Sequence, residues 1–203
     1  MKSIGVIPAR WASTRFPGKV LAEFNGKSML QHVWERAKTS RQLSDVLIAC
    51  DHENVLNAAT KFGAKAVMTS ADHPSGTDRI AEAVKDMDVE IVVNVQADEP
   101  LIRAKMIDDL VEALSRDSYA QMATLILPVT NPVDLENPNI VKVVTDHNGY
   151  ALYFSRSKIP FDRDHSADVK SYYKHIGIYA YRKNFLTGFK SLPALKLEKT
   201  EKL

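Results

Sequence analysis

The sequence is short of the features that mark secreted, membrane and nucleic-acid-binding proteins. One cysteine, Cys50, in 203 residues excludes an internal disulfide, and its place at the end of an apolar run predicts a buried strand thiol. No run approaches the ~18 apolar residues of a membrane span, and the amino terminus shows no basic segment followed by an apolar core. Lys and Arg number 27 against 25 Asp and Glu, so no global charge attracts nucleic acid or a membrane surface. We therefore expect a cytoplasmic protein that acts on small molecules.

Glycine is scarce too, and the glycine-rich phosphate-binding motifs are missing. The chain has 8 glycines. Gly26-Lys27-Ser28 matches the last three residues of the phosphate-loop motif, but Leu21 occupies the position where that motif needs its first glycine. No Gly-x-Gly-x-x-Gly occurs either. These segments are therefore excluded as nucleotide-binding loops, and Gly26-Lys27-Ser28 is interpreted as a turn and helix cap.

The first half of the chain alternates strand-like and helix-like segments. With 203 residues, of which 45% are hydrophobic, the chain is long enough to bury a substantial core. Ser28 is suited to cap the first helix. We expect strands at residues 4–7, 45–50, 65–69, 91–95 and 121–129, and helices at 29–37, 53–62, from Ser75 or Thr77 to about 87, and 104–116. This order predicts an α/β protein with a Rossmann-like, doubly wound and mostly parallel sheet.

The pattern changes in the segment from about 128 to 173, where prolines and polar connectors interrupt the helices. Residues 140–145 and 150–154 flank a turn sequence, Asp146–Gly149, that is suited to a hairpin. A strand at 173–181 and a helix-like segment at 194–203 follow. We therefore expect residues 1–203 to form one α/β domain with an appended, β-rich lobe at about 128–173.

A local excess of positive charge follows the first predicted strand. Lys2, Arg10, Arg15 and Lys19 are the only charged residues before Glu23. The carboxyl end of a parallel strand is where open α/β sheets bind ligands. The sequence therefore predicts that this loop binds a polyanion. The alternative is a solvated loop whose cations pair with scattered carboxylates.

Two further polar motifs accompany this loop. Gln96–Pro100 follows the most strand-like run at the same sheet edge, and its Asp98 is a candidate ligand for Mg²⁺, which carboxylates and substrate phosphates commonly hold together. His73–Arg79 joins a strand to a helix, and its small polar residues are suited to contact a base edge or a phosphate. The alternatives are a turn or capping carboxylate and a plain capping loop.

Taken together, the motifs resemble one family. The segments Pro8-Ala9-Arg10, Ser13-Thr14-Arg15, Pro17-Gly18-Lys19, His73–Arg79, Gln96–Pro100, Tyr150–Arg156 and His175–Arg182 are similar, in this order, to the 3-deoxy-manno-octulosonate (Kdo) cytidylyltransferases. The first motif is typical of the wider class of sugar nucleotidyltransferases, and the later motifs narrow the resemblance to the Kdo branch of that class. The resemblance covers essentially the whole chain.

The resemblance implies a nucleotide-diphospho-sugar transferase fold and transfer of CMP from CTP to the anomeric hydroxyl of Kdo, releasing pyrophosphate. It also implies Mg²⁺ as the cofactor, a homodimer formed through the lobe, and activation of Kdo for lipopolysaccharide biosynthesis. Two alternatives stay open. One is a cytidylyltransferase for a related acidic sugar, such as 8-amino-Kdo or a sialic acid, and the other is a noncatalytic nucleotide-binding homologue.

The resemblance also implies roles for individual residues. Arg10, Lys19 and Asp98 would be catalytic, with Asp98 holding Mg²⁺. The nucleotide would be bound by Ala9, Arg10, Arg15, Lys19, Ser75, Gly76 and Arg79. The acidic sugar would be bound by Gln96, Arg156, His175 and Tyr179. Arg156 suits the sugar carboxylate because a planar guanidinium binds carboxylates bidentately. The alternative for His175 and Tyr179 is packing in the core.

The sequence departs from the family pattern in two places. Ala97 stands where family members usually have glycine, which matters if that position needs a positive φ. Family chains continue for several dozen residues past Leu203, through a Glu-Gln pair that binds Kdo and an Asp that is a second metal ligand. We therefore expect a truncated chain with weak or absent catalysis and retained nucleotide binding.

Overall fold

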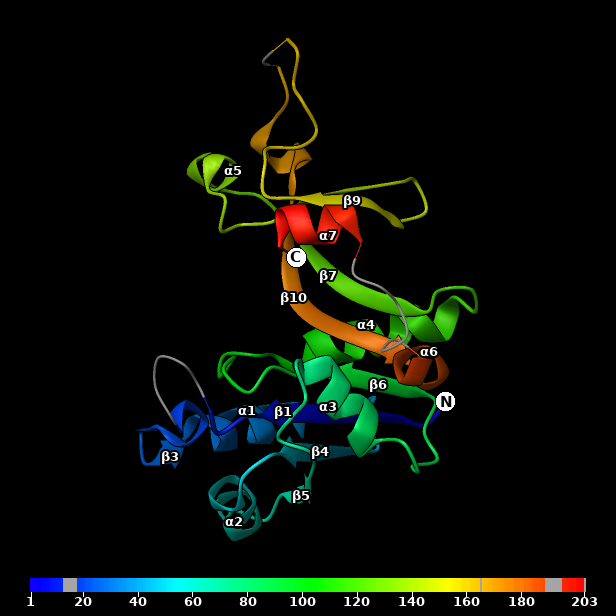
Figure 1. Ribbon diagram of the computed structural model, residues 1–203. Helices are drawn as coiled ribbons and strands as arrows, with labels where there is room; N and C mark the ends of the chain where they lie inside the picture. The colour runs from blue at the N-terminus through cyan, green and yellow to red at the C-terminus, as the bar shows by residue number, and fades with distance from the viewer. Residues whose placement is uncertain (13–17, 165, 189–194, 203) are drawn as a thin grey trace. The chain divides into compact units, whose positions relative to one another are not determined.

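The structure, a computed structural model, describes residues 1–12, 18–164, 166–188 and 195–202 (Figure 1). The chain divides into two compact units. Unit 1 comprises Met1–Ala123 and Ile178–Leu192, and unit 2 comprises Thr124–Gly177 and Pro193–Leu203. The segment at about 128–173 lies inside unit 2. Within the described ranges, no helix is both long and apolar enough to cross a membrane.

Unit 1 is built on a mostly parallel sheet. Its strands follow the order β5 (Lys65–Met68), β4 (Asp45–Cys50), β1 (Ser3–Ala9), β6 (Ile91–Asn94) and β10 (Tyr173–Arg182). β1 pairs in parallel with β4 and β6, β4 pairs in parallel with β5, and residues 179–182 of β10 run antiparallel to β6. All of β6 is buried, as expected for a strand covered on both faces. The predicted α/β class and mostly parallel sheet are confirmed.

The helices of unit 1 begin close to the predicted positions. They are α1 (Met29–Ala37), α2 (Glu53–Lys61), α3 (Gly76–Ala83) and α4 (Ala104–Arg116). The Ser28 hydroxyl caps α1 by accepting a hydrogen bond from the amide of Gln31 at 3.2 Å, which confirms the predicted cap. The short elements of unit 1 that were not predicted are the helix α6 (Lys183–Gly188), the 3-10 turn η1 (Lys19–Leu21) and the paired strands β2 (Glu23–Phe24) and β3 (Lys27–Ser28).

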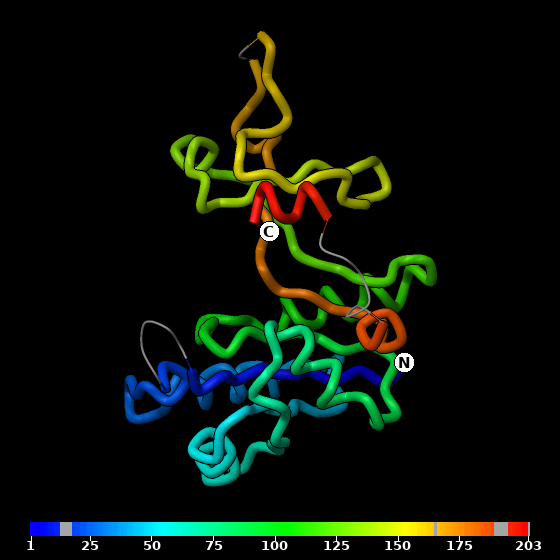
Figure 2. Tube along the Cα trace, in the orientation of Figure 1, coloured from blue at the N-terminus to red at the C-terminus, as the bar shows by residue number. Residues whose placement is uncertain are grey.

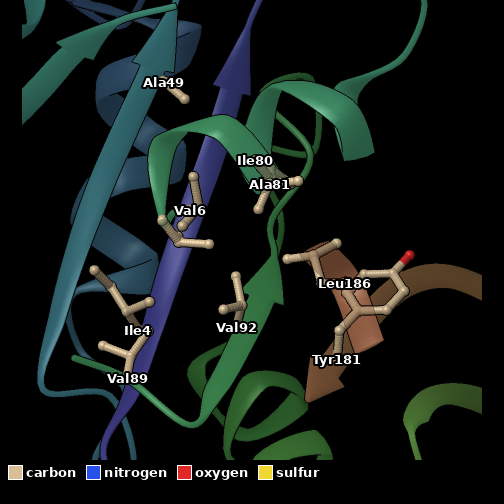
Figure 3. Packing of buried hydrophobic residues seen from close by; sticks show 10 residues of the cluster. Ile4, Val6, Ala49, Ile80, Ala81, Val89, Val92, Tyr181 and Leu186 are labelled. Atoms are coloured by element: carbon tan, nitrogen blue, oxygen red, sulfur yellow. The ribbon is translucent and has the colours of Figure 1, made fainter. Parts of the chain in front are cut away.

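The core of unit 1 holds α3 against the sheet. Figure 3 shows Ile80 of α3 facing Val6 of β1 and Val92 of β6. All three side chains are buried, and full burial of such a side chain contributes about 1.5–3 kcal/mol. Leu186 of α6 and Tyr181 of β10 extend the same cluster. This packing fixes the start of α3 near the carboxyl end of β1.

Unit 2 contains a hairpin, short helical turns and the carboxyl-terminal helix. Its elements are β7 (Met122–Pro128), which pairs with β10, α5 (Val133–Glu136), β8 (Lys142–Thr145), β9 (Ala151–Ser155), η2 (Val169–Ser171) and α7 (Lys196–Glu201). β8 and β9 are antiparallel across the turn at 146–149, which confirms the predicted hairpin. Figure 2 shows α7 beside β9, although 46 residues separate Ser155 from Glu201.

Candidate functional site

Three chain segments that follow parallel strands meet at the carboxyl edge of the sheet in unit 1. Arg10 follows β1, Asp51 follows β4, and Gln96–Pro100 follows β6. Because these strands are parallel, their carboxyl ends share one edge of the sheet, where open α/β proteins bind ligands.

Lys19 and Asp98 come together at this edge. The Lys19 Nζ lies 2.9 Å from Asp98 Oδ2, and about half of each side chain is exposed. An exposed ion pair of this kind contributes about 0–1 kcal/mol to stability. The pair therefore joins a cation and a carboxylate that a ligand can reach, at little cost to the fold if it separates.

Arg10 connects the cationic loop to the start of α3. Its exposed guanidinium donates from Nη2 to the carbonyl oxygens of Pro74 at 3.2 Å and His73 at 3.4 Å. These acceptors are neutral carbonyl oxygens, and among the described residues no carboxylate forms an ion pair with Arg10. Arg15, assigned to the same loop from the sequence, lies outside the described residues.

Ser75 and Gly76 form the amino-terminal turn of α3. The Ser75 hydroxyl accepts a hydrogen bond from the amide of Asp78 at 3.1 Å and donates to its carboxylate at 2.7 Å. A Cβ at Gly76 would lie 3.2 Å from Pro8 Cγ, so a glycine lets this turn approach β1 closely. The Ser75 side chain is thus committed to the cap, which leaves main-chain groups as the available recognition elements of this turn.

Arg79 lies behind the site and is nearly inaccessible, with 1% of the residue exposed. Its guanidinium donates to Asp51 Oδ2 at 2.9 Å and to the Thr69 hydroxyl at 2.6 Å. The other oxygen of Asp51 accepts a hydrogen bond from the amide of Trp11 at 2.8 Å. Arg79, which the sequence nominated for nucleotide binding, is engaged by protein groups, and its direct contact with nucleotide stays a prediction.

Sequence reasoning missed Asp51 and Trp11. The signal that could have found Asp51 is its place immediately after a buried parallel strand, at the sheet edge where Asp98 follows β6. Trp11 directly follows Arg10, and nothing in the sequence indicates what its ring or its amide contacts.

Gln96 and Tyr179 belong to neighbouring strands of unit 1. The Gln96 amide donates to Asn94 Oδ1 at 3.2 Å, and Asn94 is the register partner of Tyr179 on β10. Burial raises the pKa of Tyr179. Burial also raises the pKa of Tyr181 to about 12, and the rings of the two tyrosines stack on each other. Both phenols are therefore neutral hydrogen-bonding groups over the physiological pH range.

The alanine at position 97 is compatible with the backbone. Among the non-glycine residues that the structure describes, positive φ values occur at Asn25 and Lys202. Ala97 is buried and needs no left-handed conformation. The departure from the family's glycine therefore leaves the loop after β6 unstrained.

In unit 2, the Arg156 guanidinium is held by three main-chain carbonyls. Nε donates to Glu201 O at 2.7 Å, Nη1 to Pro138 O at 2.8 Å and Nη2 to Lys202 O at 3.1 Å. In return, the Glu201 carboxylate accepts hydrogen bonds from the amide of Arg156 and the hydroxyls of Ser155 and Tyr153, and these bonds lower its pKa. All three of these acceptors of the Arg156 guanidinium are neutral carbonyl oxygens.

His175 is largely enclosed in unit 2. Its Nε2 lies 2.8 Å from the Thr124 hydroxyl, and the edge of its ring packs against Phe154 with centroids 5.0 Å apart. Burial lowers the pKa of His175, which favours the neutral imidazole. A neutral ring acts as a hydrogen-bonding group for a ligand and adds no positive charge.

The donor set of the described residues fits a metal that a substrate helps to hold. Among the residues with assigned positions, no three His, Cys, Asp or Glu side chains gather closely enough to form a metal site. Mg²⁺ is commonly held by only one or two carboxylates, with phosphates and water completing its six oxygens. The half-exposed Asp98 carboxylate matches that arrangement.

Comparison with known proteins agrees with this geometry. The family model described as cytidylyltransferase matches residues 4–203. The 3-deoxy-manno-octulosonate cytidylyltransferase of Solibacter usitatus is 52% identical, over 100% of this chain and 80% of that protein. The enzyme of the same name from Chloroherpeton thalassium is 50% identical, over 100% of this chain and 83% of that protein.

A solved structure is similar over the whole of this chain. It is a CMP:2-keto-3-deoxy-manno-octonic acid synthetase complexed with CTP, with 41% identity and a TM-score of 0.94, and the match covers 83% of that protein. With sequence identity of about one half to named relatives and a family match from residue 4 to 203, this chain belongs to the 3-deoxy-manno-octulosonate cytidylyltransferase family.

Proposed function

We propose that this protein transfers CMP from CTP to the anomeric hydroxyl of Kdo and releases pyrophosphate. The observation that carries the proposal is the 2.9 Å contact between Lys19 and Asp98 at the carboxyl edge of the parallel strands. It brings together a cation suited to phosphate and a carboxylate suited to Mg²⁺, although 79 positions separate them. Family membership supports CTP as the nucleotide and Kdo as the sugar.

In the proposed reaction, the anomeric oxygen of Kdo attacks the α-phosphorus of CTP. A bond forms between these two atoms, the bond from the α-phosphorus to the oxygen that bridges to the β-phosphorus breaks, and the hydroxyl proton passes to solvent. Negative charge increases on the leaving pyrophosphate. Arg10 and Lys19 stabilise this charge, because cations held in place beforehand need no reorganisation during the reaction. Arg15 has the same role on the family resemblance.

We assign Mg²⁺ as the cofactor and Asp98 as its ligand among the described residues. When bound, the ion supplies charge neutralisation at the phosphates and lowers the pKa of a hydroxyl that contacts it. Lys19 keeps the Asp98 carboxylate at the sheet edge. Because both side chains are half-exposed, the carboxylate can exchange its lysine partner for a cation.

The remaining residues are assigned by family resemblance. The main chain at Ser75 and Gly76 is assigned to hydrogen bonds with the cytosine, and Ala9 to a position beside the nucleotide. Arg79 is assigned to support of the nucleotide site from behind. The resemblance assigns the acidic sugar to Gln96, Tyr179, Arg156 and His175. Arg156 is suited to the sugar carboxylate, because a planar guanidinium binds carboxylates bidentately.

We also propose a homodimer formed through residues 128–173. In the described part of this segment, six large apolar side chains are exposed: Val133, Tyr150, Leu152, Tyr153, Phe161 and Tyr173. Exposed apolar groups of this kind are frequent at interfaces.

The reaction consumes CTP, which supports a cytoplasmic location, and its product would serve lipopolysaccharide biosynthesis.

Pyrophosphate release tests the proposed function. The 203-residue protein, with its length confirmed by intact mass, is incubated with CTP and Mg²⁺, with and without Kdo, 8-amino-Kdo or N-acetylneuraminic acid. We expect that any release, even if weak, requires CTP and Kdo together. Faster release with either other sugar would reassign the substrate, and no release from folded protein that binds CTP would contradict catalysis by this chain.

A further inference from the structure

We propose that the buried pair of Asp51 and Arg79 positions the two described ends of the cationic loop, at Trp11 and Gly18. In this inference, which rests on the proposed function, neither residue touches the substrate. Both residues act through Trp11. Trp11 follows Arg10 and lies in the same loop as Lys19, and Arg10 and Lys19 are the described cations of the site. Asp51 and Arg79 are therefore positioning residues for CTP binding.

The first step is the geometry of the Asp51 carboxylate. Oδ2 accepts from the Arg79 guanidinium at 2.9 Å, and Oδ1 accepts from the Trp11 amide at 2.8 Å. The side chains of Arg79 and Asp51 expose only 2% and 7% of their surface. Each carboxylate oxygen thus has its own partner, and water has little access to the pair. The main chain one residue after Arg10 is tied to a charge inside the protein.

The second step is that Trp11 holds both ends of the loop. Its carbonyl accepts a hydrogen bond from the amide of Gly18 at 2.9 Å, directly before Lys19. Its ring stacks on His52 with centroids 4.5 Å apart, and the imidazole of His52 caps α2 through Nδ1. A Cβ at position 18 would lie 3.0 Å from the ring, so the glycine, at φ +71°, packs closely on it. Fixing Trp11 therefore fixes the main chain beside both cations.

The third step is that Arg79 aligns α3 with the same loop. Its guanidinium also donates to the Thr69 hydroxyl at 2.6 Å, and that hydroxyl donates to the Cys50 carbonyl at 2.9 Å. Arg79 thus joins α3 to the ends of β4 and β5. The segment that leads into α3 supplies the Pro74 carbonyl that holds Arg10. The ion pair consequently sets the loop and the acceptor of its arginine relative to each other.

Stability alone gives a poor account of this arrangement. A buried ion pair recovers little more than the cost of removing its charges from water, and well-packed apolar residues often do as well. What the pair adds is direction, because the carboxylate must lie between a guanidinium and one particular amide. Catalysis and binding depend steeply on such placement, and a displacement of about 1 Å can cost a hundredfold.

Three variants separate positioning from stability. Arg79→Met leaves a buried carboxylate unpaired and should lower the melting temperature. Asp51→Leu with Arg79→Met removes both charges and the acceptor for the Trp11 amide, so the melting temperature should recover while CTP affinity stays about tenfold or more below wild type. Asp51→Asn with Arg79→Met keeps an acceptor oxygen for that amide and should regain most of the CTP affinity. Lys174→Met, which breaks a 3.0 Å ion pair in unit 2, is the matched control.

The measurements are calorimetric titration with CTP at a temperature where every variant is folded, and thermal unfolding of the same samples. Wild type is titrated first, because failure of wild type to bind CTP would contradict the proposed function itself. If wild type binds and the Asp51→Leu double variant binds equally well, only the positioning inference is overturned. The inference is overturned as well if the Asp51→Asn double variant binds no better than the Asp51→Leu one, or if Lys174→Met weakens CTP binding as much.

Discussion

Lys19 and Asp98 balance each other's charge at the sheet edge of unit 1. Their half-exposed pair contributes about 0–1 kcal/mol to folding. Replacing either residue should therefore change ligand binding much more than stability. By contrast, Asp51 and Arg79 are buried, and replacing one of them should affect folding as well.

The Asp98 carboxylate should make CTP binding sensitive to Mg²⁺. In Asp98→Asn, we expect CTP to bind without metal at least as tightly as in wild type, because a negative charge near the triphosphate is gone. Addition of Mg²⁺ should then strengthen binding much less than in wild type, because an amide is a weaker ligand than a carboxylate. Calorimetric titrations with and without Mg²⁺ measure both effects. Asp109→Asn, on α4 with 43% of its side chain exposed, is the control, and an unchanged response to Mg²⁺ in Asp98→Asn would contradict the assignment.

His175 should make the stability of the protein depend on pH. Burial lowers its pKa in the folded state, so below the unfolded value of about 6.5 the unfolded chain binds more protons. The stabilising contribution of the neutral ring is therefore complete above about pH 6.5 and decreases as the pH falls toward the lower, folded pKa. Denaturant unfolding at several pH values from 5 to 8 measures the slope. In His175→Gln the slope should be smaller, and an identical slope would show that other groups cause it.

At the level of helices and strands, regular periodicity decided what could be predicted. The strand at 45–50 and the helix at 104–116 match β4 and α4, because long apolar patterns fix both the type and the position of an element. The short elements β2, β3 and α6 were missed, since two to six residues without a long apolar run show no periodicity.

Contacts within the site were predictable only where the sheet alone fixes them. Asp98 and the cationic loop follow parallel strands, so their meeting at one edge was expected. The burial of Arg79 was not predicted, because a helix-capping sequence does not indicate which face of the helix a later arginine occupies. The pairing of Arg156 with the end of α7 is a contact across 45 residues that local sequence does not encode.

Glu201 should hold α7 on the hairpin. Its carboxylate is the acceptor for the Arg156 amide, the Ser155 hydroxyl and the Tyr153 phenol. In Glu201→Ala, we expect faster amide hydrogen exchange at Arg156 and earlier protease cleavage near α7. Lys199→Ala, on the same helix, is the control and should leave both rates unchanged. Equal protection of Arg156 in both variants would show that the helix is held by other contacts.

For the molecule as a whole, the two units divide the assigned groups between them. Unit 1 carries the cations and carboxylate assigned to the nucleotide, while Arg156 and His175 belong to unit 2. Unit 2 also carries the exposed apolar side chains proposed for self-association. The sequence anticipated a segment of different character at about 128–173, because prolines and a hairpin turn interrupt the helix alternation there.

Self-association should depend on the apolar surface of unit 2. Leu152 lies on β9 with 67% of its surface exposed, and a charge there would have to be buried in a dimer. We expect Leu152→Glu to shift the mass measured by light scattering from dimer toward monomer. Leu101→Glu, at a comparably exposed position in unit 1, should leave the mass unchanged. A dimer that tolerates Leu152→Glu and dissociates with Leu101→Glu would place the interface elsewhere.

The central claim is that the carboxyl edge of unit 1 binds the triphosphate of CTP, and calorimetric titration of Lys19→Met with CTP tests it most directly. Lys105→Met, which breaks an exposed 2.7 Å ion pair on α4, is the matched control. Loss of one charge-assisted contact should weaken CTP binding about tenfold or more in Lys19→Met, with wild-type affinity in Lys105→Met. Equal CTP affinity in wild type and Lys19→Met would contradict the account.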